Sequence, residues 1–474
     1  MYACGDEKMN ILLIRPKFSG TFAEYTTPPL GLAYLAAVLE AKEHKVLILD
    51  GWVQDLNSDF LKKTIADFKP AMIGLTGLTV NIKGVFAMAE EIKKEFPKIP
   101  IIFGGPHASM APERTLQDVS AIDIVCVGEG EGTILDIIDY LHGEKTLEEI
   151  PGIYYRQANA VVSTGLRELI SDINQLPPPA RHLLPIGSYT ASPKEHKSFP
   201  GTDVITSRGC PYACAFCFKQ VFGNKYRTHS PEYVISEIKF LIKNYSIKDI
   251  FFRDDTFTVD YERVKKICEL IKKENIHITF TTLARVDRLN YELLKLMKEA
   301  GCWKILLGIE SGNQKSLNLL RKGITLNQIE ETVKNCRNLG IETDGFFMIG
   351  IPGETKEDAK NTINFAKRLK LDFAQFYICT PYPGTYLYEI AKTHGKIDIQ
   401  EGEWDKYNQF GAKNLLFVPD GWTSKTLKEY QAKAWKNFYF RPIYLLQRLS
   451  KLRSFSEFKN HFLGAVKLFS AFDR

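Results

Sequence analysis

Residues 207–217 read SRGCPYACAFC and contain three of the nine cysteines of the 474-residue chain. Cys210, Cys214 and Cys217 come directly after residues 203–206, a short run that is typical of a buried strand. A loop of this length can turn three sulfur atoms toward one centre. Because a [4Fe–4S] cluster has four irons, three thiolates leave one iron free to bind a ligand. The stretch therefore predicts such a cluster at the end of a strand.

Zinc is the alternative occupant of a cysteine-rich loop. Structural zinc takes four ligands, and its cysteines commonly follow CxxC spacing. The nearest further candidate ligand in the sequence is His229. The CxxxCxxC spacing and the position after a strand favour an iron–sulfur cluster over zinc.

Strand and helix patterns alternate on both sides of this loop, which predicts an α/β protein. Five β-α units with continuously apolar strands occupy residues 9–145 and indicate a doubly wound, Rossmann-like domain. Six further units occupy residues 201–392 and indicate a partial (β/α)6 barrel, with its active face at the C-terminal ends of the strands. Strands are expected at 10–14, 46–49, 71–75, 101–103 and 124–127, and then at 203–206, 250–252, 278–281, 305–307, 343–348 and 373–378.

Two segments depart from the alternation. Residues 146–200 contain a predicted hairpin at 153–162 and three consecutive prolines at 177–179, and we interpret them as a linker. Residues 393–474 form a helical, aromatic and basic C-terminal region, in which Pro442 should interrupt the helix. The basic excess lies in this region, so a local basic surface is indicated and nucleic-acid binding is not.

The helical tail allows two interpretations. Its apolar face could pack on the open barrel as a cap, or its basic amphipathic surface could touch anionic lipid at the inner membrane surface. Apolar runs such as 72–75 are too short to span a bilayer. The scattered remaining cysteines and the lack of a signal peptide indicate a cytoplasmic protein, and Met9 is a second candidate start.

With Phe216 before its last cysteine, the CxxxCxxC pattern resembles the signature of the radical S-adenosylmethionine (SAM) superfamily. The resemblance implies that SAM binds the free iron, and that one electron from the cluster cleaves SAM to methionine and a 5′-deoxyadenosyl radical. Carboxylates suit the ribose and amino groups of SAM, an arginine suits its carboxylate, and glycine lets the backbone approach the adenine. The SAM-binding residues predicted at barrel strand ends are Phe216, Asp254, Arg285, Glu310 and Gly350.

Small and glycine-rich strings end the predicted strands of the first domain, and GxGxxG is absent after the first strand, so a dinucleotide site is not expected. These strings resemble the cobalamin-binding domain of cobalamin-dependent radical SAM enzymes. That family joins this domain to this barrel in this order, and the resemblance extends to about Lys392. The cobalamin-binding residues it implies are Pro29, Leu30, Gly31, Thr76, Gly77, Thr79, Gly104, Gly105, Gly128, Glu129 and Gly130.

The cobalt is expected to lack a histidine from the DxHxxG motif of other cobalamin proteins. The nearest string, at residues 139–143, has the wrong spacing. His107 lies beside glycines 104 and 105, and we interpret it as a loop or packing residue rather than a cobalt ligand.

The resemblance implies a [4Fe–4S] cluster, SAM and cobalamin as cofactors, with a flavodoxin or ferredoxin as reductant. The leading hypothesis is methylation of an unactivated carbon in a small-molecule or lipid-like substrate. The alternative is radical oxidative cyclisation or ring rearrangement, as in the tetrapyrrole cyclase branch. RNA methylthiolation is less expected, because those enzymes carry extra cluster cysteines, whereas here the N-terminal domain offers only Cys126, with Cys4 before it.

Overall fold

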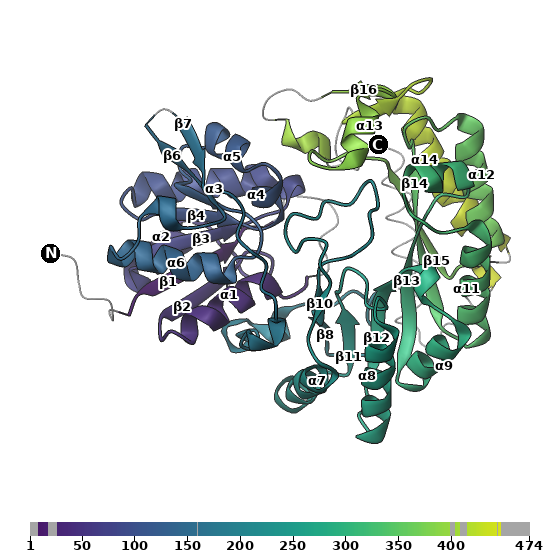
Figure 1. Cartoon of the computed structure of the whole chain (residues 1–474), viewed down its shortest axis with the longest axis horizontal. Helices are drawn as coiled ribbons and strands as arrows, with labels where there is room; N and C mark the ends of the chain where they lie inside the picture. The colour runs from purple at the N-terminus through teal and green to yellow at the C-terminus, as the bar shows by residue number, and fades with distance from the viewer. Residues whose placement is uncertain are drawn as a thin grey trace.

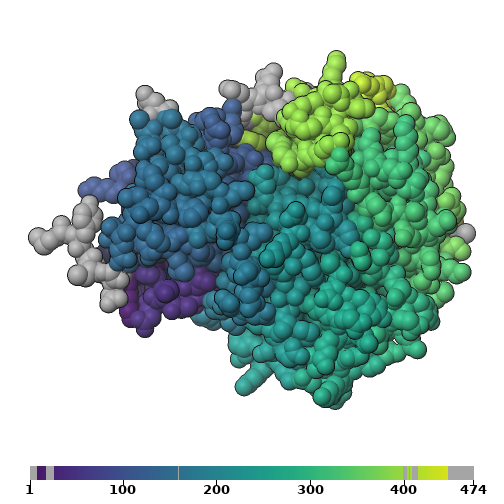
Figure 2. Space-filling view, viewed as in Figure 1, coloured from purple at the N-terminus to yellow at the C-terminus, as the bar shows by residue number. Residues whose placement is uncertain are grey.

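The computed structural model describes residues 8–17, 26–158, 160–398, 403–407, 415–442 and 444–446. Figure 1 shows two lobes side by side: an N-terminal lobe in purple and blue, and a larger lobe in teal and green. The C-terminal segments, in yellow-green, lie along the upper and outer sides of the larger lobe. In Figure 2 the two lobes abut, with atoms of both in contact along the boundary.

The N-terminal lobe is built on a seven-stranded sheet of order β2-β1-β3-β4-β5-β6-β7. Strands β1 to β5 are parallel, and helices cover both faces, which confirms the doubly wound domain. Helices α1 and α6 pack on one face, and α2 and α3 on the other. The elements are β1 (Asn10–Arg15), α1 (Leu30–Glu40), β2 (Lys45–Asp50), α2 (Ser58–Phe68), β3 (Met72–Thr76), η1 (Thr79–Asn81), α3 (Ile82–Glu95), β4 (Ile101–Gly104), α4 (Pro106–Met110), α5 (Pro112–Asp118), β5 (Ile124–Cys126) and α6 (Glu131–His142).

The hairpin expected in the linker belongs to this sheet. Strands β6 (Ile153–Gln157) and β7 (Ala160–Ser163) continue it antiparallel, with β6 paired to β5. The sheet therefore extends beyond residue 145, because the alternating buried side chains Ile153 and Tyr155 place β6 against the edge of β5.

The rest of the linker is a packed segment with three short turns, η3 (Ile173–Gln175), η4 (Arg181–Leu183) and η5 (Ile186–Ser188). The buried Arg181 donates to Glu237 at 2.9 Å and to the carbonyl of Asp203 at 2.8 Å. His196 lies 2.9 Å from Asp249. Paired charges of this kind hold the segment against the second lobe.

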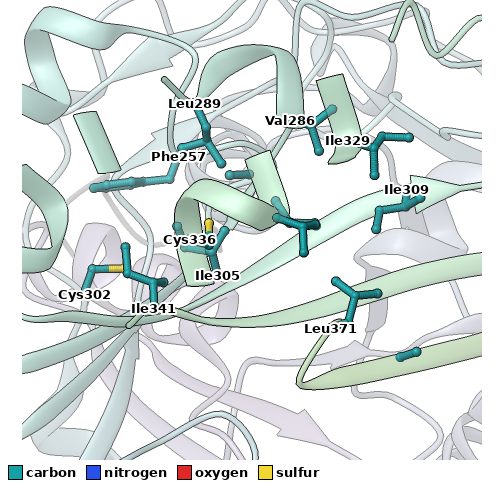
Figure 3. Packing of buried hydrophobic residues seen from close by; sticks show 14 of the residues in the cluster. Phe257, Val286, Leu289, Cys302, Ile305, Ile309, Ile329, Cys336, Ile341 and Leu371 are labelled. Atoms are coloured by element: carbon teal, nitrogen blue, oxygen red, sulfur yellow. The ribbon is translucent and has the colours of Figure 1, made fainter. Parts of the chain in front are cut away.

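The second lobe contains a six-stranded parallel sheet of order β15-β14-β13-β12-β11-β8, which confirms the partial barrel. Buried residues between its strands and the outer helices include Cys268, Cys302 and Cys336 (Figure 3 shows the last two). Its elements are β8 (Gly201–Val204), α7 (Pro231–Tyr245), β11 (Asp249–Phe252), α8 (Tyr261–Lys273), β12 (Thr279–Ala284), η6 (Val286–Arg288), α9 (Tyr291–Glu299), β13 (Cys302–Glu310), α10 (Gln314–Leu319), α11 (Leu326–Asn338), β14 (Glu342–Ile349), α12 (Lys356–Arg368), β15 (Phe373–Ile378) and α13 (Tyr386–Ala391).

The described part of the C-terminal region contains the expected helix and, before it, a short strand pair. An antiparallel pair, β16 (Gly395–Ile397) and β17 (Phe417–Pro419), and the turn η7 (Trp404–Tyr407) precede α14 (Ser424–Tyr439). Helix α14 ends before Pro442, as its sequence predicts.

Helix α14 covers the open edge of the barrel sheet. The Tyr439 hydroxyl donates to the carbonyl of Ala374 and accepts from its N–H, at 2.9 and 3.1 Å, and Gln431 donates to the carbonyl of Phe376 at 2.8 Å. These bonds satisfy backbone groups that an edge strand leaves unpaired. Residues 430–446 therefore act as the expected cap, except for residue 443, which is not described. The lipid-facing interpretation concerns residues up to 472, most of which lie outside the described residues. No helix in the described ranges is long and apolar enough to cross a bilayer.

Candidate active site

The three cysteines lie on the loop that follows β9 (Ser207–Arg208), which pairs antiparallel with β10 (Arg227–Thr228). The Arg285 guanidinium donates to Cys214 Sγ at 3.5 Å. A hydrogen bond from Cys217, with help from Lys322 and Arg285, lowers the pKa of Cys214 to about 6. A thiol of low pKa is available as the thiolate that binds iron. The loop thus combines three thiols with a positively charged surrounding, which fits an iron–sulfur cluster.

His229, the nearest candidate for a fourth zinc ligand, packs against another side chain. His229 is buried and stacks on Tyr233, with ring centroids 3.9 Å apart. Burial lowers its pKa to about 3.

A buried ion pair lies beside the cysteines. Glu310 ends β13 and accepts from Lys322 Nζ at 2.8 Å. A Cβ added to Gly308 would lie 2.6 Å from Lys322 Nζ and 2.7 Å from the Glu310 carboxylate, so a side chain there would displace the ion pair. Glu310 itself has a φ of +67°, a left-handed conformation that is rare outside glycine and often marks functional sites. Lys322 follows α10 in a turn, and no pattern in the sequence marks it.

Arg285 reaches the cysteine loop, but most of its donors are used. It donates to both carboxylate oxygens of Asp287 and, at 2.6 Å, to the carbonyl of Lys322, besides its contact to Cys214. Its guanidinium also lies 3.9 Å from the ring centroid of Tyr212. Of five N–H donors, one remains for the SAM carboxylate that the sequence assigns to it. Arg285 therefore acts mainly as an anchor for the loop.

The structure gives Asp254 a supporting position. Its carboxylate accepts from the N–H and hydroxyl of both Thr206 and Ser207, at 2.5–3.1 Å. These four bonds clamp the chain where it enters β9. Asp254 therefore positions the start of the cysteine loop, and its role in binding SAM stays a prediction.

Phe216 packs against a small apolar cluster that includes Ala215 and Ile351, and Gly350 directly precedes Ile351 in the chain. The N–H of Gly350 donates to the buried carboxylate of Glu354 at 2.6 Å. Burial raises the pKa of Glu354 to about 8. The Phe216 ring centroid lies 5.5 Å from the Nζ of Lys322. Of the five predicted SAM residues, Phe216, Arg285 and Glu310 are brought together around the cysteines.

The predicted cobalamin residues lie at the C-terminal ends of β3, β4 and β5 and the start of α1, at one edge of the sheet. Gly105 has a φ of +100°, and a Cβ there would lie 2.5 Å from Thr76 Oγ1. A Cβ added to Gly31 would have no neighbour within 4 Å, and Leu78 is 51% exposed. Open space and an exposed apolar side chain fit a large cofactor at the switch point between β1 and β3. The remaining predicted residues here are Pro29, Leu30, Gly77, Thr79, Gly104, Gly128 and Gly130.

His107 is enclosed by protein. Its ring meets Trp404 edge-on at 4.6 Å, and its Nδ1 lies 3.1 Å from Thr79 Oγ1. Burial lowers its pKa to about 3. Trp404 in turn donates to Asp118 at 3.1 Å, so the C-terminal region touches the N-terminal lobe here. These contacts support the interpretation of His107 as a packing residue.

Glu129 differs from the other predicted cobalamin residues. Its carboxylate contacts Arg208 at 2.9 Å and Arg227 at 2.7 Å, and accepts from the N–H of Ile170 at 2.9 Å. The side chain therefore joins the two lobes and is not free for a cofactor. Neither arginine was predicted as a functional residue, although Arg208 lies within the cysteine stretch.

Comparisons with known proteins agree with this geometry. The family model "Radical SAM superfamily" matches residues 204–366, and "B12 binding domain" matches residues 17–138. A Pyrococcus horikoshii protein described as an uncharacterized methyltransferase is 37% identical over 451 residues, which cover 94% of this chain and 96% of that protein. The chain belongs to the B12-binding radical SAM enzymes.

Two other relatives of this B12-binding radical SAM enzyme carry different activities in their names. An anaerobic magnesium-protoporphyrin IX monomethyl ester cyclase from Rubrivivax gelatinosus is 26% identical, with 98% of this chain and 83% of that protein covered. A cytidylyl-2-hydroxyethylphosphonate methyltransferase from Streptomyces wedmorensis is 27% identical, with 91% and 90% covered.

Solved structures show the same fold. The cobalamin-dependent SAM radical enzyme OxsB superposes with a TM-score of 0.68 at 22% identity, covering 89% of this chain and 58% of OxsB. The radical SAM methyltransferase TsrM from Kitasatospora setae gives 0.73 at 17% identity, covering 92% and 90%.

As a B12-binding radical SAM enzyme, the protein uses a [4Fe–4S] cluster, SAM and cobalamin. Cys210, Cys214 and Cys217 would hold the cluster, because they are the thiols of one loop and cations lie beside them. Glu310, beside that loop, would contact SAM. The glycine-rich strand edge of the N-terminal lobe would hold cobalamin.

Proposed function

We propose that this enzyme transfers a methyl group to an unactivated carbon of a small-molecule or lipid-like substrate. When bound, the cluster supplies the electron that cleaves SAM, and cobalamin supplies the methyl group. The observation that carries the proposal is the contact between the two cofactor-facing loops. A Cβ added to Gly128, on the cobalamin side, would lie 3.7 Å from the carbonyl of Gln220, just after the cysteines. Because the loops touch here, a substrate bound beside this contact would face both cofactors.

The chain's own residues perform binding and orientation. Arg285 and Lys322 favour the thiolate of Cys214, since a nearby cation lowers the pKa of a thiol. The enclosure of His107 supports its role as a packing residue rather than a cobalt ligand. Holding donor and acceptor in a fixed arrangement is a major source of rate enhancement.

The alternative outcome, oxidative cyclisation, is supported by the resemblance to the magnesium-protoporphyrin ester cyclase. Anaerobic incubation with cobalamin, reductant, candidate extracts and SAM labelled in its methyl group distinguishes the two. Methylation places the label in a product that has gained one CH2 unit, whereas cyclisation gives an unlabelled product that has lost hydrogen. Cys214→Ala protein and a reaction without cobalamin serve as controls. An unlabelled product that needs cobalamin would contradict methyl transfer.

The reductant would be a flavodoxin or ferredoxin, and a reducing, cytoplasmic setting suits such a cluster. Cys217 is exposed, which supports access for an electron donor. Peripheral membrane contact through the basic residues after 446 remains part of the proposal. Liposome flotation at low salt tests it: equal flotation with anionic and neutral vesicles would contradict membrane contact.

A further inference from the structure

Four charged side chains form a buried group where the two lobes meet. Glu129 and Glu131 come from the loop after β5 and the first turn of α6, while Arg208 and Arg227 lie opposite each other on β9 and β10. Arg208 contacts Glu129 at 2.9 Å and Glu131 at 2.6 Å, and Arg227 contacts Glu129 at 2.7 Å. We refer to these four residues as the interlobe charge cluster.

The interlobe charge cluster fixes one arrangement of the lobes. Its two positive and two negative charges balance, and burying them is favourable only while every charge keeps a partner. Arg208 and Arg227 would repel each other across the strand pair without Glu129 between them. The Arg208 guanidinium also lies 5.0 Å from the ring centroid of Tyr34 and 5.2 Å from that of Phe222.

Arg208 is connected rigidly to the first cysteine. Gly209, between Arg208 and Cys210, has a φ of +80°, and a Cβ there would lie only 2.4 Å from the carbonyl of Lys225. Because closely packed backbone transmits displacement, a shift of Arg208 moves Cys210 as well.

In the interlobe charge cluster, Glu129 belongs to the cobalamin-facing loop. Gly128 donates its N–H to Ser109 at 3.0 Å and directly precedes Glu129. The cobalamin-facing loop therefore continues directly into Glu129, whose carboxylate contacts Arg208.

We propose that Arg208 is a positioning residue that couples the cobalamin-facing loop to the cluster-binding loop. This inference rests on the proposed function, since it requires both cofactors in one chain. Coupled sites change each other's affinity by the same factor, commonly about 5- to 150-fold. Cobalamin should accordingly bind the cluster-loaded protein and the cluster-free protein with different affinities.

Arg208→Lys tests the coupling in the full-length chain. A lysine keeps the charge but cannot span two carboxylates as the planar guanidinium does. Arg181→Lys is the matched control, because Arg181 and Glu237 form an equally buried pair at 2.9 Å that does not involve the cysteine loop. The dissociation constant of hydroxocobalamin is measured anaerobically for each protein, with the cluster reconstituted and with it removed by chelation.

In wild-type protein and Arg181→Lys, the dissociation constants of the cluster-loaded and cluster-free forms should differ by at least about fivefold. In Arg208→Lys they should differ by less than about twofold. If Arg208→Lys folds poorly, Glu131→Gln should give an intermediate ratio, since it retains the Glu129 contact. If Arg208→Lys and Glu131→Gln both keep the wild-type ratio of dissociation constants, the coupling is overturned and the proposed function is not. The same holds if that ratio is one in wild-type protein. Wild-type protein that binds no cobalamin in either form overturns the proposed function.

Discussion

The two strand edges that face the cofactors are built from different chemistry. The N-terminal edge offers glycines, a threonine-rich turn and an exposed leucine, so it would hold its ligand by shape and backbone contact. The barrel edge offers three thiols with Arg285, Lys322 and Glu310 around them, so it would hold its ligand through donor atoms and charge. Donor atoms act individually, whereas a contact surface shares its energy among many atoms. Substitutions should therefore have large effects at the barrel edge and graded effects at the other.

The largest effect is expected at the cysteine loop. Replacing Cys210, Cys214 or Cys217 with Ala should abolish both iron binding and SAM cleavage, because each thiolate binds one iron. Iron per chain and 5′-deoxyadenosine formation measure this after anaerobic reconstitution. Cys268→Ala and Cys302→Ala are the controls, because both cysteines are buried away from the loop, and these two proteins should keep the wild-type iron content. Activity in any of the three loop variants would contradict the cluster assignment.

Lys322→Met should destabilise the barrel by about 3–5 kcal/mol, because it leaves Glu310 buried and unpaired. Chemical denaturation followed by circular dichroism measures the loss. Lys360→Met is the control, since Lys360 pairs with Glu357 at the surface and such pairs contribute about 0–1 kcal/mol. Similar losses in both variants would show that charge does not hold this edge together.

The two lobes should respond to pH in opposite directions. Glu354 has its pKa raised by burial from 4.5 to about 8, so the folded state binds its proton more tightly, and stability falls as pH rises through that interval. His107 has its pKa lowered by burial from 6.5 to about 3, so stability falls as pH drops through that interval.

Glu354→Gln should remove the fall in unfolding free energy between pH 4.5 and about 8, and His107→Gln the fall between pH 6.5 and about 3, each about 5 kcal/mol at most. Wild-type protein over the same pH range is the reference. Parallel curves for a variant and wild type would show that the group does not titrate on unfolding.

The smallest effect is expected at the glycine edge. Gly105→Ala should weaken cobalamin binding, because alanine at this positive φ adds about 2 kcal/mol of backbone strain to the loop. The iron content should stay unchanged. Gly31→Ala meets no protein atom and favours helix α1 by up to about 1 kcal/mol. Weaker cobalamin binding by Gly31→Ala would therefore report direct contact with the cofactor, and unchanged binding would exclude that contact. Equilibrium dialysis measures both variants.

The sequence predicted the elements whose signals are local. Strand β15 was expected at residues 373–378 and is found there, because a short and mostly apolar run needs no information from elsewhere. The cysteine loop was likewise placed correctly after β8. Pairing between distant segments was not predictable: the contact of Glu129 with Arg208 joins residues 79 positions apart, and no local pattern indicates that the two pair. For the same reason the sequence did not predict the role of Lys322, the position of β6 in the sheet or the β16–β17 pair.

The side-chain bonds from α14 to β15 have a consequence for the order of assembly. During synthesis the barrel strands emerge first, and β15 remains an open template for other strands until Ser424–Tyr439 follows. Trp404, which packs on His107 in the N-terminal lobe, also arrives after the whole barrel. The segments that close both lobes thus leave the ribosome after the whole barrel. An interrupted chain would carry a complete cysteine loop on a sheet prone to aggregate.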